Sequence, residues 1–161
     1  MAGVNVNQFL ENIIQPTLLA IGMDSDKSRK LLLCTAAHES HLGRYVKQVN
    51  GPALGPYQME PATYVDIWDN YISYRPVMSE RLLTTFGYVV IPPADRLITD
   101  FAWATAMARI HYYRVKEVLP DANDIIAISE YWKKYYNSTK GKGTKERFIA
   151  DYYKFIVGGK K

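Results

Sequence analysis

The sequence predicts a mainly α-helical protein, and three observations support this fold class. Apolar side chains recur at helical spacing along most of the chain, beginning with residues 6–21. Residues that favour helix starts stand at the beginning of several of these segments, as Pro61 does. The helical pattern lapses between residues 42 and 60, where we expect at most a small β element, with a short strand at 45–49.

Seven helical segments are expected. Pro16 kinks the first or divides it in two, and Asp24, Ser25 and Asp26 cap the second. The fifth is the longest, and its alanine-rich middle lets other helices approach closely, so it is expected to be the buried central helix. The segments span residues 6–21, 27–40, 61–71, 77–86, 94–118, 123–137 and 144–157.

Size and composition predict one globular domain over residues 1–161. The single cysteine, Cys34, lies in an apolar run and is interpreted as a small core residue, so no internal disulfide is expected. No apolar run approaches the roughly 20 residues that span a bilayer, and the start of the chain lacks a signal-peptide pattern. We therefore expect synthesis in the cytoplasm without an export signal.

The net charge of +4 and the pI near 9.0 favour association with polyanions such as nucleic acid, anionic lipid or an anionic cell envelope. The basic residues gather toward the C-terminal end, from Lys133 to Lys161. They form either a solvated face that aids solubility or a tail that contacts an anionic envelope.

One stretch, residues 31–63, carries the candidate chemistry: LLLCTAAHESHLGRYVKQVNGPALGPYQMEPAT. Its apolar start leads directly to Glu39, so this carboxyl is expected to lie against apolar neighbours. Burial disfavours the charged form and raises the pKa of a carboxyl, as a general acid near neutral pH requires. Further on, Gly55 lets the backbone approach a ligand, and Gln58 offers both a donor and an acceptor. This pattern is typical of an active site.

Three separated motifs resemble those of lytic transglycosylases and goose-type lysozymes. The first is the pair Glu39-Ser40, and the third is Tyr136-Asn137, where the family has Tyr-Asn-Ala-Gly. The second, GPYQMEPAT at residues 55–63, stands where the family has Gly-Leu-Met-Gln-Ile-Met-Pro-Ala-Thr. It departs from that pattern at Pro56, Tyr57 and Glu60.

The resemblance implies a lysozyme-like fold and cleavage of the β-1,4 bond between N-acetylmuramic acid and N-acetylglucosamine in peptidoglycan. Protonated Glu39 would donate to the leaving oxygen, then accept the proton of the sugar's own 6-hydroxyl as that oxygen closes onto C1. In the hydrolytic alternative, Glu60 would be the second carboxylate and would activate water. A carboxylate directly before Pro61 also favours a helix start, so Glu60 has an equally good structural explanation.

The resemblance further assigns substrate binding to a group of residues around this acid. Tyr57 and Gln58 are expected to line the groove and Tyr136 to stand across it, with its hydroxyl orienting Glu39. The structural alternatives are a Glu39 capped or paired with a nearby arginine such as Arg44, and a Tyr136 packed among the aromatic residues beside it. The group consists of Ser40, Tyr57, Gln58, Tyr136 and Asn137.

The histidines flanking Glu39, His38 and His41, together with His111, raise the alternative of a metal site. Two histidines three apart can share a helix face, but the zinc-peptidase pattern needs them four apart. We expect no metal and no cofactor, and interpret His41 as a polar neighbour of the cleft.

Two non-enzymatic alternatives are a basic phage protein that binds nucleic acid or fills a virion, and an inactive lysozyme-like fold that only binds cell wall. Basic and aromatic residues do not alternate along one stretch, so no specific nucleic-acid partner is expected. The favoured prediction is a monomeric bacteriophage endolysin that acts on peptidoglycan glycan strands. It would stay in the host cytoplasm until another protein opens a lesion to the cell wall; a virion-associated lysin is the alternative.

Overall fold

The computed structural model describes residues 3–138 and 140–160. Helix accounts for 63% of it, and no strand forms within the described residues, so the predicted mainly α class is confirmed. None of the described helices has both the length and the apolar character needed to cross a bilayer. In chain order the elements, with η marking π or 3₁₀ turns, are α1 (Val6–Phe9), η1 (Leu10–Ile14), α2 (Gln15–Ala20), α3 (Asp26–Ser40), α4 (Pro61–Asn70), η2 (Ile72–Tyr74), α5 (Pro76–Phe86), α6 (Arg96–Thr99), α7 (Phe101–Tyr113), α8 (Ile125–Trp132), η3 (Lys133–Asn137), α9 (Lys145–Asp151), η4 (Tyr152–Val157) and η5 (Gly158–Lys160).

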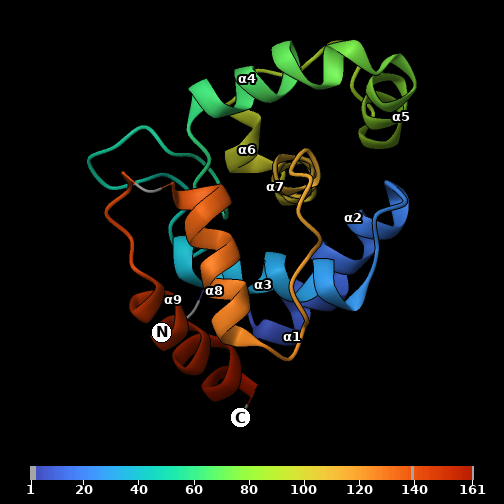
Figure 1. The fold of residues 1–161 in the computed structure, drawn as a ribbon. Coiled ribbons are helices and arrows are strands. Elements are labelled where there is room, and N and C mark those ends of the chain that lie inside the picture. Colours follow the sequence, from blue (N-terminus) through green and yellow to red (C-terminus); the bar gives the residue numbers. More distant parts are fainter. Residues whose placement is uncertain (1–2, 139, 161) are drawn as a thin grey trace.

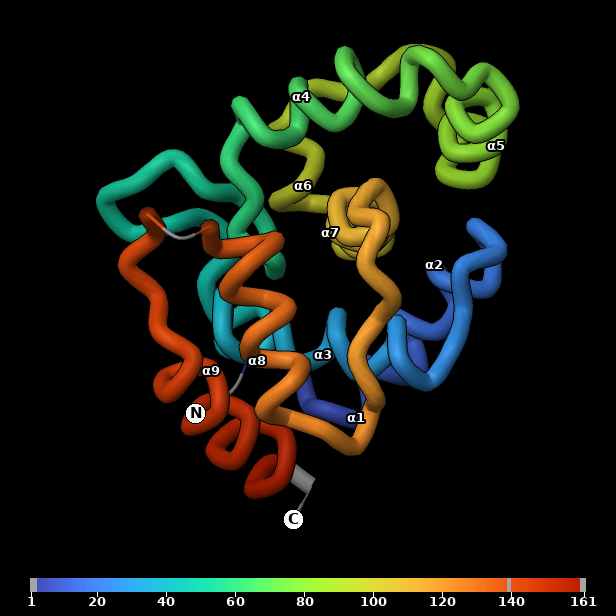
Figure 2. The backbone as a smooth tube through the Cα atoms, viewed as in Figure 1, coloured from blue at the N-terminus to red at the C-terminus, as the bar shows by residue number. Residues whose placement is uncertain are grey.

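Helix α7 runs through the middle of the molecule and is seen end-on in Figure 1. It contacts α2, α3, α4 and α6, and every residue from Trp103 to Ile110 is buried. The prediction of a buried central helix in this segment is therefore confirmed. Helices α8 and α9 pack against each other and against α3, and Figure 2 shows all three on the side of α7 away from α4 and α5.

The central segment is nevertheless shorter than predicted, and the expectation of one helix over 94–118 is wrong. Asp100 has an extended backbone (φ −122°, ψ 94°), which separates α6 from α7. Its carboxylate accepts from the Trp103 backbone N–H at 2.9 Å and from the Tyr88 hydroxyl at 2.7 Å. Asp100 therefore caps a new helix instead of continuing the old one.

The first helical segment accommodates Pro16 through a π-helical turn, η1. The Gln15 backbone N–H bonds to the Leu10 carbonyl, five residues back. A proline lacks the N–H that an α-helix needs, and the wider turn just before it absorbs the change. The predicted irregularity at Pro16 is confirmed in this form.

The expected strand at 45–49 does not form. Isolated bridges connect Lys47 to Leu54 and Leu54 to Met59 instead. Each bridge is a single residue pair, because the chain turns again before a ladder can extend. Lys161, the last residue of the basic C-terminal tail, lies outside the residues that the structure describes.

Candidate active site

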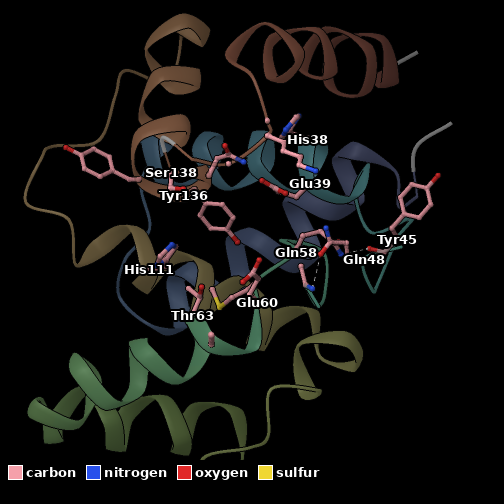
Figure 3. Close-up of a pocket in the computed structure, with 18 of the residues that line it drawn as sticks. His38, Glu39, Tyr45, Gln48, Gln58, Glu60, Thr63, His111, Tyr136 and Ser138 are labelled. Atoms are coloured by element: carbon pink, nitrogen blue, oxygen red, sulfur yellow. Dashed lines mark hydrogen bonds between the residues drawn. The ribbon is translucent and has the colours of Figure 1, made fainter. Parts of the chain in front are cut away.

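A cleft of about 1000 Å³ lies beside α3. Figure 3 shows Glu39 and Glu60 on opposite walls of this cleft, with Tyr136 and Gln58 beside them. The volume is sufficient for an extended organic ligand. The walls come from the end of α3, the loop that leads into α4, the end of α7, and residues 135–138 and 141–143.

Glu39 occupies the last turn of α3 and is partly buried. Its Oε1 accepts a 2.9 Å hydrogen bond from Nε1 of Trp132. Burial raises the pKa of Glu39, while the nearby His38 and the Trp132 hydrogen bond oppose the rise. Because the net direction is upward, Glu39 holds its proton to higher pH than a surface glutamate does and is suited to donate it to a ligand.

The Trp132 indole is fully buried and is held by neighbours from α9 and α3. It stacks on Phe148 with 4.9 Å between ring centroids and meets the His38 ring edge-on at 4.6 Å. His38 is fixed in turn, because its Nδ1 lies 2.7 Å from Asp151 Oδ2. The contact between Trp132 and Glu39 was not predicted from the sequence, because no local signal connects two residues 93 positions apart.

Ser40 lies beneath the cleft, contrary to the expectation that it contacts substrate. Its side chain is fully buried, and it is not among the described residues that line the cleft. Ser40 Oγ donates to the Pro56 carbonyl at 2.6 Å and accepts from the Gly43 backbone N–H at 2.8 Å. Ser40 therefore joins the end of α3 to the loop that forms the next wall.

That loop turns at residues 55–58. Gly55 has φ +76°, and a Cβ there would lie 2.3 Å from the Leu97 carbonyl oxygen, so no larger residue fits without displacement. Gln58 also adopts a left-handed backbone (φ 47°), and its Nε2 donates to the Gly55 carbonyl at 2.9 Å. This geometry places Gln58 in the cleft wall, where it was expected.

The same turn directs Tyr57 into the core, so the expectation that Tyr57 lines the groove is wrong. Its side chain is 1% exposed, and its hydroxyl lies 2.9 Å from Thr105 Oγ1. Burial raises the pKa of Tyr57. Only the Tyr57 carbonyl is used at the cleft, because it accepts a 2.6 Å hydrogen bond from the Tyr136 hydroxyl.

Tyr136 lines the cleft from η3, stacked on Tyr112 with 5.1 Å between ring centroids. Its hydrogen bond to the Tyr57 carbonyl links η3 to the turn on the other wall. Burial, and secondarily the charge of Glu39, raise the pKa of Tyr136, so it remains a donor. The expected role of orienting Glu39 belongs to the Trp132 indole instead.

Asn137 lines the cleft at the end of η3, as expected. Its Oδ1 accepts a 2.7 Å hydrogen bond from Lys133 Nζ, which also donates to the carbonyls of Gly141 at 2.8 Å and Gly143 at 2.7 Å. One ammonium group therefore closes the loop that forms this part of the wall. Within η3 the π-helical turn adds a residue, a feature often found where side chains serve a site.

Glu60 is exposed and lines the cleft directly before Pro61 opens α4. It occupies the N-cap position of α4, but its side chain makes no capping hydrogen bond there. Its place at the start of α4 agrees with the structural explanation, in which a carboxylate near a helix N-terminus is favoured by the helix dipole. Glu60 also faces the same space as Glu39 (Figure 3).

A polar chain on the cleft wall was not predicted from the sequence. Arg114 donates to His111 Nδ1 at 3.0 Å and to Asp66 Oδ2 at 2.7 Å. Burial, with Arg114 next in importance, lowers the pKa of His111 to about 4, so the ring is neutral at physiological pH. Asp66 lies on α4, and its pairing with Arg114 depends on a contact between α4 and the end of α7.

The histidines are engaged separately from one another. His38 pairs with Asp151, His41 stacks on Phe155 at 4.4 Å between centroids, and His111 accepts from Arg114. In the part of the chain that the structure describes, no three His, Cys, Asp or Glu side chains are grouped to hold a metal ion.

Comparisons of the chain with protein-family models, with curated proteins and with solved structures gave no match. The residues and geometry of the cleft are therefore the basis of the functional proposal.

Proposed function

We propose that this protein is a glycosidase that cleaves the β-1,4 bond between N-acetylmuramic acid and N-acetylglucosamine in peptidoglycan. One observation carries the proposal: Glu39, a carboxyl of raised pKa held by an indole N–H, lies in a cleft of about 1000 Å³. The motifs at residues 39–40, 55–63 and 136–137 support it through their resemblance to lytic transglycosylases and goose-type lysozymes. A lysozyme-like arrangement of the helices is part of the same proposal.

The favoured chemistry is that of a lytic transglycosylase. Glu39 protonates the oxygen of the leaving sugar while positive charge develops at C1 of muramic acid. The ionised Glu39 then takes the proton of the 6-hydroxyl of that sugar, and the 6-oxygen bonds to C1, giving a 1,6-anhydro end. One carboxyl thus acts first as acid and then as base, without water as a co-reactant.

A hydrolytic muramidase is the second candidate, and one observation favours it. Glu60 lines the same cleft from the opposite wall, and no capping hydrogen bond occupies its carboxylate. It is therefore available to activate a water molecule against C1 while Glu39 protonates the leaving oxygen.

The cleft offers the two kinds of contact that a glycan strand needs. The rings of Tyr45, Tyr135 and Tyr136 provide apolar faces for sugar stacking, and the amides of Gln58 and Asn137 provide polar groups for hydroxyl and acetamido groups. Ligand sites typically combine aromatic side chains, which provide contact area, with a few polar groups, which fix the orientation of the ligand, and this cleft has both.

The biological setting belongs to the same proposal. A monomeric peptidoglycan lysin fits a bacteriophage endolysin that reaches the cell wall through a lesion made by another protein, or a virion-associated lysin. The net charge of +4 favours contact with an anionic envelope.

Mass spectrometry of the soluble products from purified peptidoglycan tests the proposal. Wild type, Glu39→Gln and Glu60→Gln are compared, with Glu80→Gln as control because Glu80 is an exposed glutamate on α5, outside the cleft. Products with 1,6-anhydro ends that disappear only in Glu39→Gln identify a transglycosylase. Products with free reducing ends that disappear in both cleft variants identify a muramidase. No products from wild type would overturn the glycosidase proposal.

A further inference from the structure

A second cavity, of about 910 Å³, lies between α5, α7 and the junction of α2 with α3. No described residue lines both this cavity and the cleft. We call it the α5–α7 cavity. Figure 2 shows α5 and α2 at the same side of the central helix α7, away from the cleft loop.

The α5–α7 cavity contains a buried cation for which the described part of the chain supplies no acidic partner. Arg109, in the middle of α7, is only 7% exposed and lines the cavity. Its Nε and Nη1 atoms are buried and have no hydrogen-bond partner within the described residues. Its electrostatic neighbours among the described residues are Tyr131 and Tyr113, and the centroid of the Tyr113 ring lies 5.4 Å from the guanidinium carbon in a cation–π contact. Burial removes part of the hydration of this charge, and among the described residues neither a hydrogen bond to these two nitrogens nor an acidic partner replaces it, so the arrangement is costly.

Two more arginines lie at the cavity wall. Arg81 donates a long 3.4 Å hydrogen bond to the Ala20 carbonyl, and Arg75 donates to the Tyr71 carbonyl at 2.8 Å. A guanidinium carries five N–H donors, so both residues retain donors for a ligand.

The acidic residue that lines the cavity is already neutralised. Asp24 receives a hydrogen bond of 2.6 Å from Nε of Arg29 and pairs with the same guanidinium through its other oxygen. The hydrogen bond from Arg29 lowers the pKa of Asp24, so the pair stays ionic. The charge that remains in the cavity is therefore positive.

Most of the remaining wall is apolar. It is formed largely by residues of the α2–α3 junction and α5, namely Ile21, Met23, Tyr71, Val77, Met78 and Leu82. An oxyanion beside Arg109 would supply the missing countercharge, and these side chains would cover an attached apolar group. Charge-assisted bonds from guanidinium groups to carboxylate or phosphate are among the strongest in proteins.

We propose that the α5–α7 cavity binds an amphipathic organic anion, with a phosphate or carboxylate head against Arg109 and an apolar body against α5. The site is independent of the glycosidase proposal, because it shares no described lining residue with the cleft.

Isothermal titration calorimetry with the purified full chain tests this site, using octyl phosphate, inorganic phosphate and octyl glucoside as probes. We expect octyl phosphate to bind at least roughly tenfold more tightly than either other probe, because only it provides both the charge and the apolar body. Equal affinity for inorganic phosphate would overturn the amphipathic ligand and identify a free oxyanion as the ligand. Equal affinity for octyl glucoside, or no binding of octyl phosphate at millimolar concentration, would overturn the anion site.

Three variants locate the binding. Arg109→Met and Arg81→Ser should each lower the affinity for octyl phosphate, the first by roughly tenfold or more. Arg147→Ser, which removes an exposed arginine of α9, is the matched control and should leave the affinity unchanged. Arg109→Met should also raise the Tm of the ligand-free protein, because it replaces an unpaired buried charge by an apolar chain. Wild-type affinity in both cavity variants, or an equal loss in Arg147→Ser, would overturn the assignment.

Discussion

Nε1 of Trp132 lies 2.9 Å from Oε1 of Glu39, across 93 positions of sequence. This hydrogen bond joins the last turn of α3 to the end of α8 and fixes one oxygen of the carboxyl that the proposed reaction requires. It also stabilises the ionised form, so it moderates the rise in the pKa of Glu39 that burial causes.

Replacing Trp132 by phenylalanine should shift the pH dependence of activity. Phe retains an aromatic ring against Phe148 but removes the N–H donor. Because that donor lowers the pKa of Glu39, its loss raises the pKa further, and the basic limb of the pH–rate profile should move to higher pH. Activity at the optimum should fall roughly tenfold, since the carboxyl loses a hydrogen bond that orients it.

The control for that experiment is Trp103→Phe. Trp103 is also fully buried, and its Nε1 donates to the Tyr64 hydroxyl at 3.3 Å, away from Glu39. The variant Trp103→Phe should lower the Tm without moving the basic limb of the pH–rate profile. A basic limb that stays in place in Trp132→Phe would contradict the coupling to Glu39.

Glu39→Gln should stabilise the fold near neutral pH. The pKa of Glu39 is higher in the folded chain than in the unfolded chain, because of burial, so the folded state binds this proton more tightly. The contribution of the carboxyl to stability is full below its unfolded pKa of about 4.3 and is lost as the pH rises through the folded pKa. The variant should therefore have a higher Tm than wild type near pH 7, and the difference should shrink near pH 4. A difference in Tm that stays constant between pH 4 and pH 7 would show that burial does not shift the titration of Glu39.

His111 should make the fold sensitive to acid. Its folded pKa of about 4 lies below its ordinary value, so stability is full above about 6.5 and is lost as the pH falls toward 4. The difference between the two values corresponds to about 3 kcal/mol of unfolding free energy. Urea unfolding of wild type and His111→Gln across this range should show a smaller pH-dependent loss in the variant. Parallel curves would mean that the ring titrates normally.

Ser40→Ala should destabilise the fold, because Ser40 anchors the loop after α3 and does not contact the cleft. The change leaves the Pro56 carbonyl and the Gly43 N–H without their partner, at a cost of about 1–3 kcal/mol. Ser73→Ala, which removes an exposed hydroxyl on η2, should cost much less. Denaturant midpoints measure both, and an unchanged midpoint in Ser40→Ala would contradict the anchoring role.

The parts of the site that the sequence predicted are those governed by neighbouring residues. Glu39 follows an apolar run that buries one side of its helix, so its placement at a partly buried helix end follows from local pattern. Gln58 follows Gly55, which occupies a tight turn with no room for a larger residue. Glu60 precedes a proline that begins a helix. Each of these relations spans a few residues, so periodicity and turn chemistry are sufficient to describe it.

The error at Tyr57 arose because side chains in that turn had two directions available. Tyr57 and Gln58 are adjacent in one turn, yet one enters the core and the other the cleft. Composition cannot separate them, because both are compatible with a groove wall. The decision comes from Thr105 on α7, which provides a buried partner for the Tyr57 hydroxyl.

The sequence by itself determined the mainly α class, the central position of the alanine-rich segment and the candidate acid at Glu39, because periodicity, caps and apolar runs are properties of short windows. Only the tertiary structure decided which groups surround that acid and which cations lack partners. Trp132 reaches Glu39, Asp66 reaches Arg114, and Arg109 finds no acid among the described residues. These outcomes depend on how helices distant in sequence pack, since pairing and desolvation are set by spatial neighbours rather than by neighbours along the chain.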